Sequence, residues 1–115
     1  MIKHLEKSED FASITANDKK VVVDFFATWC GPCRMMARVI EEIQEDFEDI
    51  TFLKVDVDQF PDIAQSYMIT NIPSFAFFKD GNSISYSLNG QKGFLLVGGL
   101  QEDDFKSLLV ETFEK

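Results

Sequence analysis

The chain contains few of the residues that build metal sites, disulfide-rich scaffolds or membrane anchors. Among its 115 residues are two cysteines, one histidine and three prolines. Two cysteines are too few for the disulfide framework of a small secreted domain. The N-terminal stretch MIKHLEKSEDF lacks the apolar core of a signal peptide, and no stretch nears the roughly 18 apolar residues of a membrane-spanning helix. The sequence therefore predicts a cytoplasmic protein, and its length predicts one domain over residues 1–115.

Basic side chains are also scarce. Eleven Lys and Arg stand against twenty Asp and Glu, which gives a net charge of -9. Because such a chain repels phosphate groups, neither nucleic acid nor an anionic membrane is an expected partner. Proteins with basic patches suit it better, and the same charge favours solubility. The hydrophobic fraction of 45% is that of a globular protein, and the twelve Phe predict an aromatic-rich core.

Apolar patterning predicts strands and helices in alternation. Residues 21–27, VVVDFFA, form a continuous apolar run typical of a strand buried on both faces, and residues 33–47 carry apolar side chains at helical spacing. Residues 2–5 fit an edge strand, and residues 11–17 fit a short helix. Further along come a strand at 51–58, a short helix from Pro61, a strand, turn and strand at 74–88, and a helix at 101–113. This order predicts an α/β fold with a central mixed β-sheet flanked by helices on both faces.

The two cysteines stand three positions apart in ATWCGPCRMMA, between the predicted strand and the predicted helix. A structural zinc site needs about four Cys or His ligands. Besides Cys30 and Cys33 the chain offers only His4, which disfavours zinc within one chain, although two chains could share a metal. A structural disulfide across so small a loop removes little unfolded-state entropy. The third alternative is a redox pair.

The residues around the cysteines favour the redox alternative. At a helix N-terminus, unpaired backbone N–H groups and the helix dipole lower the pKa of the Cys30 thiol and make it a nucleophile. Cys33, one turn further along, is expected to be more shielded and suits the resolving thiol. Gly31 permits a tight turn, and Pro32 fits the first helical turn without losing a needed N–H. Trp29 is expected to be a partly exposed ring that shapes the site.

Four segments, in order, resemble the thioredoxin family: VVVDFFATWCGPCRMMA, KVDVD, NIPSFAFFKDG and VGG. The resemblance implies the thioredoxin fold and the activity of a protein-disulfide reductase, a thiol-disulfide oxidoreductase. It implies no bound cofactor, since NADPH is used indirectly through a thioredoxin reductase. The implied substrates are oxidised proteins such as peroxiredoxins or ribonucleotide reductase, and the expected state is a monomer. Gly-Pro between the cysteines favours a reducing member over the disulfide isomerases, which commonly have Gly-His.

The resemblance also implies a proton-transfer pair. Asp24 matches a buried aspartate of the family, which would exchange a proton with Cys33 through water. Lys54 matches the lysine that lies near that aspartate and tunes it electrostatically. Cys30, Cys33, Asp24 and Lys54 are therefore the expected catalytic residues.

A substrate-docking surface follows from the same resemblance. Pro73 matches the family's cis-proline, which packs against the cysteines. The backbone of Ile72 would pair with an extended substrate segment, and the missing N–H of Pro73 would keep that edge open. The docking residues implied in this way are Trp29, Gly31, Pro32, Ile72, Pro73 and Gly98.

The chain departs from the family pattern at several places. Arg38 stands where the family commonly has a helix-kinking proline, Phe26 where many members have a Trp, and Ser74 where Thr is usual. Between FKDG and VGG the chain is longer by roughly nine residues, an insertion that a surface loop tolerates at little cost. Asn-Gly at 89–90 is a hairpin signal. Residues 83–88 and 94–97 are therefore expected to form an extended β-hairpin or extra edge strand around residues 82–97, which could alter the choice of partner.

A second hypothesis belongs to another class of protein. The chain could be a non-enzymatic thioredoxin-fold binding or scaffold subunit that grips a partner without redox turnover. The intact cysteines, Asp24 and Pro73 favour the reductase.

Overall fold

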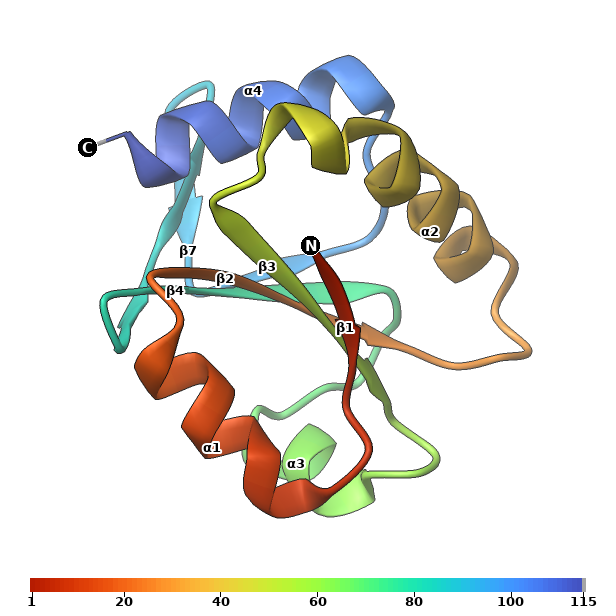
Figure 1. Ribbon diagram of the computed structural model, residues 1–115. Coiled ribbons are helices and arrows are strands. Elements are labelled where there is room, and N and C mark those ends of the chain that lie inside the picture. The colour runs from red at the N-terminus through yellow and green to blue at the C-terminus, as the bar shows by residue number, and fades with distance from the viewer. Residues whose placement is uncertain (115) are drawn as a thin grey trace.

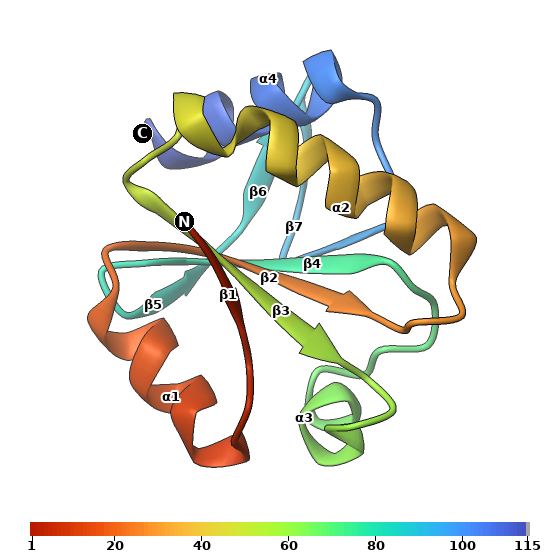
Figure 2. The ribbon, with the colours of Figure 1, turned by 45° about the vertical axis from the view of Figure 1, so that its right-hand side comes forward.

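A twisted mixed sheet lies at the centre of the protein, between two layers of helices (Figure 1, Figure 2). The structure is a computed structural model and describes residues 1–114. The helices are α1 (Ser8–Asn17), α2 (Gly31–Ile43), α3 (Pro61–Ser66) and α4 (Glu102–Phe113), with a 3-10 turn, η1 (Gln44–Asp46), after α2. The strands are β1 (Ile2–His4), β2 (Lys20–Phe26), β3 (Ile50–Asp56), β4 (Ser74–Lys79), β5 (Asn82–Ile84), β6 (Tyr86–Leu88), β7 (Gln91–Gly93) and β8 (Leu95–Val97).

The main sheet has six strands in the order β1-β3-β2-β4-β5, and β8 also pairs with β4. β1 and β2 run parallel to β3, whereas β4 runs antiparallel to β2. The predicted mixed sheet, the N-terminal edge strand and the first helix are therefore confirmed. The strand predicted at 51–58 ends at Asp56, because the Asp56 carboxylate accepts the backbone N–H of Asp58 and turns the chain.

β2 is central because its side chains are buried on both faces of the sheet. Val22 faces the α2 and α4 layer, and Val21, Val23 and Phe25 face the α1 and α3 layer. All four are fully buried. The continuous apolar run in the sequence is thus the signature of a strand with a helix layer on each side.

α2 carries the cysteine motif at its first turn and packs its apolar stripe on the sheet. Met36, Ile40 and Ile43 are buried, as the helical spacing of apolar residues predicts. The helix runs without a break past Arg38, which is exposed where the family commonly has a proline. It begins two residues earlier than predicted, because Cys30 serves as its N-cap.

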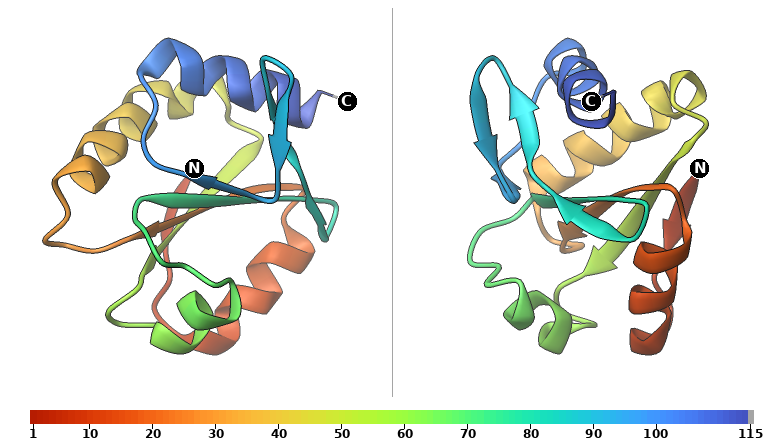
Figure 3. Two further views of the ribbon diagram at one scale, coloured as in Figure 1. Left: turned by 180° about the vertical axis from the view of Figure 1, so that it is seen from behind. Right: turned by 90° about the vertical axis from the view of Figure 1, so that its left-hand side faces the viewer.

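The insertion splits one edge strand into two. β5 pairs with the far end of β4, at 77–79, and β8 pairs with the near end, at 74–76. Between them β6 and β7 form a separate hairpin that turns at residues 89–90 and stands beside α4 (Figure 3). The hairpin predicted from Asn-Gly is confirmed, but residues 83–88 are not one strand. After Ile84 the chain leaves β4 so that Leu88 packs in the core beneath α4, and the Ser87 N–H donates to Thr112 Oγ1 at 3.0 Å.

Within the described residues, no helix has the length and apolar character needed to cross a membrane.

Candidate active site

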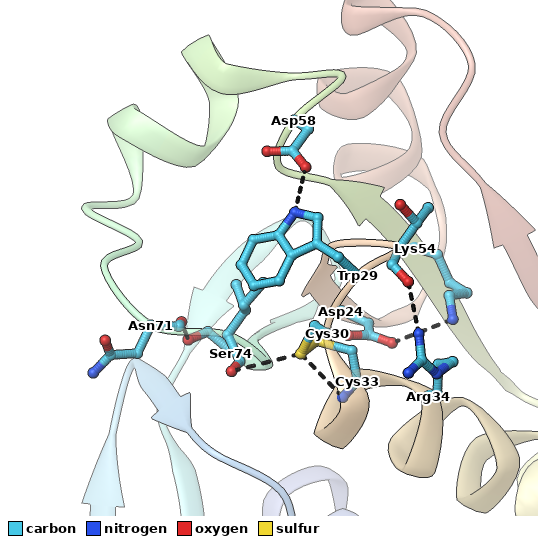
Figure 4. Close-up of a disulfide and its surroundings, with 11 residues drawn as sticks. Asp24, Trp29, Cys30, Cys33, Arg34, Lys54, Asp58, Asn71 and Ser74 are labelled. Atoms are coloured by element: carbon cyan, nitrogen blue, oxygen red, sulfur yellow. Dashed lines mark hydrogen bonds and ion pairs between the residues drawn. A yellow bond between two sulfur atoms is a disulfide. The ribbon is translucent and has the colours of Figure 1, made fainter.

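The two cysteines lie where the loop after β2 enters α2, and they are joined in a disulfide with their Cα atoms 5.2 Å apart (Figure 4). Cys30 is the N-cap residue of the helix, and its Sγ accepts a hydrogen bond from the backbone N–H of Cys33 at 3.2 Å. Pro32 stands in the first turn, where its missing N–H removes no helical hydrogen bond. A backbone N–H and the positive end of a helix dipole beside a sulfur are features that favour negative charge there.

The predicted docking residues adjoin this disulfide from a second segment of the chain. The Cys30 Sγ lies 3.9 Å from the carbonyl oxygen of Ile72. The Ile72–Pro73 peptide bond is cis, as the resemblance implied. The carbonyl oxygen of Pro73 accepts the N–H of Gly98 at 2.8 Å, and Gly98 has a φ of 98°, which favours glycine. A series of contacts therefore links Cys30, Ile72, Pro73 and Gly98.

Trp29 is 68% exposed, in keeping with the expectation of a ring on the surface. Its Nε1–H donates to the Asp58 carboxylate at 2.8 Å, which holds the ring in place (Figure 4). Asp58 was not expected to take part in the site, because no local pattern connects it with a residue 29 positions earlier. Gly31 and Pro32, next to the ring in the sequence, are also exposed.

Asp24 lies in the middle of β2 and is fully buried. Within the described residues, neither of its carboxylate oxygens has a hydrogen-bond partner. Burial raises the pKa of Asp24 to about 6, and the ammonium of Lys54 opposes that rise. The parallel register of β2 and β3 sets Asp24 opposite Lys54, whose Nζ is 3.8 Å from Asp24 Oδ2. The same ammonium lies 4.6 Å from the centre of the Phe26 ring.

A pocket of about 240 Å³ has both Cys33 and this lysine in its lining. Arg34, which the sequence did not single out, borders the pocket and donates from Nη1 to the carbonyl oxygen of Thr28 at 2.9 Å. The volume is large enough for water. Asp24 is not among the lining residues, and the pocket reaches it only through its ion-pair partner Lys54. The lining residues are Phe26, Ala27, Thr28, Cys33, Arg34, Ala37 and Lys54.

A redox cysteine pair at a helix N-terminus, beside a cis-proline and above a buried carboxyl, defines a thiol-disulfide oxidoreductase. The family model for thioredoxin matches residues 2–102. The chain belongs to the thioredoxin family, and its activity is dithiol-disulfide exchange of the protein-disulfide reductase type.

Sequence similarity to individual thioredoxins supports this assignment. The chain is 48% identical to thioredoxin-1 of Schizosaccharomyces pombe over 73% of this chain and 82% of that protein. It is 43% identical to thioredoxin-2 of Saccharomyces cerevisiae over 74% of this chain and 83% of that protein.

Solved structures of thioredoxins have the same fold. The oxidised thioredoxin of Plasmodium falciparum superimposes with a TM-score of 0.78 at 32% identity, and 95% of each chain is covered. A second structure concerns the thiol resolving mechanism of yeast mitochondrial 1-Cys peroxiredoxin via glutathione and thioredoxin systems. It superimposes with a TM-score of 0.74 at 31% identity and covers 94% of this chain and 93% of that one.

Proposed function

We propose that Cys30 is the attacking thiol and Cys33 the resolving thiol of this reductase. The Cys30 thiolate bonds to one sulfur of a substrate disulfide, and the other substrate sulfur leaves as a thiolate. Cys33 then loses its proton and attacks Cys30, which closes the Cys30–Cys33 disulfide and releases the second substrate sulfur. Two electrons pass from the cysteine pair to the substrate. The observation that carries this order is the N–H of Cys33 directed at the sulfur of Cys30.

Asp24 is proposed to take the proton that Cys33 loses. A carboxyl with a pKa of about 6 accepts and returns a proton near neutral pH, whereas an ordinary aspartate holds its proton too weakly. Lys54 keeps that pKa from rising further, because its ammonium favours the charged carboxylate. The pocket between Cys33 and Lys54 supports a transfer through water.

The docking surface for the substrate is proposed to comprise the exposed residues around Cys30 and the segment that carries the cis-proline. The polar backbone of Ile72 beside Cys30 would pair with an extended chain, and the absent N–H of Pro73 keeps that edge open. The proposed docking residues are Trp29, Gly31, Pro32, Ile72, Pro73 and Gly98.

The electron source and the partners follow from the family. We propose that a thioredoxin reductase, supplied with NADPH, recycles the oxidised protein, and that no cofactor binds to the chain itself. Oxidised proteins such as peroxiredoxins or ribonucleotide reductase are the proposed substrates. A solved relative concerned with a peroxiredoxin supports the first of these. The proposed compartment is the cytoplasm, where a reducing pool keeps the cysteine pair in use.

Three proteins test the proposed order of attack: the wild type, Cys30→Ser and Cys33→Ser. With dithiothreitol as reductant, the wild type is expected to accelerate the precipitation of reduced insulin, and Cys30→Ser is expected to give no acceleration. Cys33→Ser should retain substrates as mixed disulfides, visible as a mass increase that disappears on reduction. Equal rates from all three proteins would contradict the reductase and support the binding subunit. Trapping by Cys30→Ser instead of Cys33→Ser would reverse the two roles.

A further inference from the structure

An apolar groove lies at the exposed edge of the main sheet, on the side of α3. Its volume is about 350 Å³. Seen from behind, β8 runs along this edge, and the segment after α3 leads up beside it to β4 (Figure 3). No charged side chain is among the lining residues, which are Ser66, Tyr67, Met68, Ala76, Ser83, Phe94 and Leu95. We call it the Phe94 groove.

Two large apolar side chains at the groove are exposed to solvent. Phe94 is 63% exposed and Met68 is 80% exposed, whereas Ala76 is buried in the sheet. Phe94 stands between β7 and β8, at the end of the insertion that lengthens this chain relative to its family. Exposing both side chains costs solvation free energy that a bound apolar group would recover.

The backbone at Met68 is a second and independent observation. Met68 has a φ of 53°, in the left-handed region that glycine adopts most easily. The residue ends α3 in a Schellman motif, with the N–H of Met68 bonded to the Gln65 carbonyl and that of Ile69 bonded to the Ala64 carbonyl. Glycine is the usual residue at this position of the motif. The helix end uses the backbone of Met68 and would be less strained with glycine, so the methionine side chain is not required there. That exposed side chain lies at the groove.

Strand β8 links the groove to the redox face. β8 runs from Leu95, which lines the groove, to Val97, and Gly98 then bonds to Pro73. Those three residue steps span about 10 Å of extended chain. Within the described residues β8 pairs only with β4, so its outer edge is open. From Gly98 the path continues through its 2.8 Å bond to Pro73 and the 3.9 Å contact between Ile72 and Cys30. An extended substrate segment that reaches Cys30 therefore meets the groove several residues away from its attacked cysteine.

We propose that the Phe94 groove binds a large apolar side chain of the oxidised protein substrate, on the extended segment that carries the attacked disulfide. The inference rests on the proposed attack by Cys30 and adds the feature by which this chain selects its substrates. The bound group is an uncharged aliphatic or aromatic side chain, because no charge lines the groove. Phe94 and Met68 are then specificity-determining residues.

The test uses the pre-reduced full-length protein and pairs of synthetic peptides. Each peptide has one cysteine in a mixed disulfide with 2-nitro-5-thiobenzoate, whose release is followed by absorbance. The two peptides of a pair differ only in Phe or Ser at one position, three to five residues to either side of the cysteine. The measured quantity is the ratio of the two second-order rate constants. Because both constants come from one protein, the ratio cancels any common change in the reactivity of Cys30.

The wild type is expected to prefer the Phe peptide at one of these positions by about tenfold, which corresponds to burial of part of a Phe side chain. Phe94→Ser and Met68→Gly should each bring the ratio close to one. Met68→Gly should also raise the melting temperature, because glycine relieves the left-handed backbone, so a lost preference cannot be attributed to unfolding. Val110→Ser is the matched control, since Val110 is an exposed apolar residue on α4, outside the groove.

The proposal is overturned if the wild type shows no preference at any position, or if both variants keep it. It is also overturned if Val110→Ser loses the preference to the same extent. The proposed function fails in a different way: peptide disulfides would then be attacked as fast by Cys30→Ser as by the wild type, whatever the peptide sequence.

Discussion

Replacing Asp24 with Asn should change the free energy of unfolding, because it removes a charge that is buried in the sheet. The carboxyl is fully buried, and within the described residues its oxygens have no hydrogen-bond partner. Lys54 at 3.8 Å offsets only part of the cost of ionisation, so the pKa still lies at about 6. Asn has nearly the same shape as protonated Asp and carries no charge. The substitution therefore removes the cost of a buried charge and leaves the packing of β2 in place.

The magnitude follows from linkage between protonation and folding. Moving the carboxyl pKa from its ordinary 3.8 to about 6 corresponds to about 3 kcal/mol, since one pKa unit is worth about 1.36 kcal/mol. The folded state holds the proton more tightly than the unfolded state, so stability falls as the pH rises. Below about pH 4 the aspartate is protonated in both states and costs nothing. The cost grows between about pH 4 and 6 and is complete above that range.

Urea unfolding of the wild type and Asp24→Asn, both oxidised, measures this cost. At pH 7.5 the variant is expected to be more stable by up to about 3 kcal/mol, and below pH 4 the two proteins should have the same free energy of unfolding. Val22→Ala, on the same strand, should lose stability equally at both pH values. A gain for Asp24→Asn that is independent of pH, or a loss at pH 7.5, would refute the assignment of a raised pKa to Asp24.

Three other substitutions test neighbouring parts of the argument. Lys54→Met should move the pKa of Asp24 above 6, because it removes the Lys54 charge that lowers this pKa. A carboxyl-carbon NMR titration measures the pKa, and an unchanged or lower value would contradict this role of Lys54. Thr112→Val should cost about 1–3 kcal/mol of unfolding free energy by leaving the buried Ser87 N–H unpaired; no loss would mean that the hairpin does not depend on α4. Phe105→Ala should cost about 3–5 kcal/mol in urea unfolding, because Phe105 is fully buried between α4 and the sheet.

The elements that could be predicted from the sequence are those whose signal is local. β2 shows its burial on both faces in a continuous apolar run, and α2 shows its buried stripe in the spacing of Met36 and Ile40. The cysteines could be placed at a helix N-terminus because Gly-Pro fits a turn and a first helical turn. In each case the pattern lies within about 15 consecutive residues, so it does not depend on how distant segments meet.

The parts that could not be predicted depend on contacts between distant segments. The bond from Trp29 to Asp58 joins two loops, and neither loop carries a pattern that points to the other. The left-handed backbone at Met68 could not be predicted from the sequence either, because the usual signal for that position is glycine. For Asp24 and Lys54, the family resemblance suggested the pairing, and the register of two parallel strands produces it.

The position of the insertion separates the choice of partner from the redox chemistry. β5 and β8 both pair with β4, and the inserted hairpin lies between them in the sequence. The insertion therefore leaves β8 paired with residues 74–76 of β4, next to Pro73. Gly98 therefore keeps its bond to Pro73, and the cis peptide keeps its place beside Cys30. An insertion between Cys30 and Cys33 would have moved the N–H that supports the Cys30 sulfur. An insertion at the edge strand can instead bring Phe94 to the substrate side of the sheet without altering the sulfur chemistry, which is why specificity is expected to reside there.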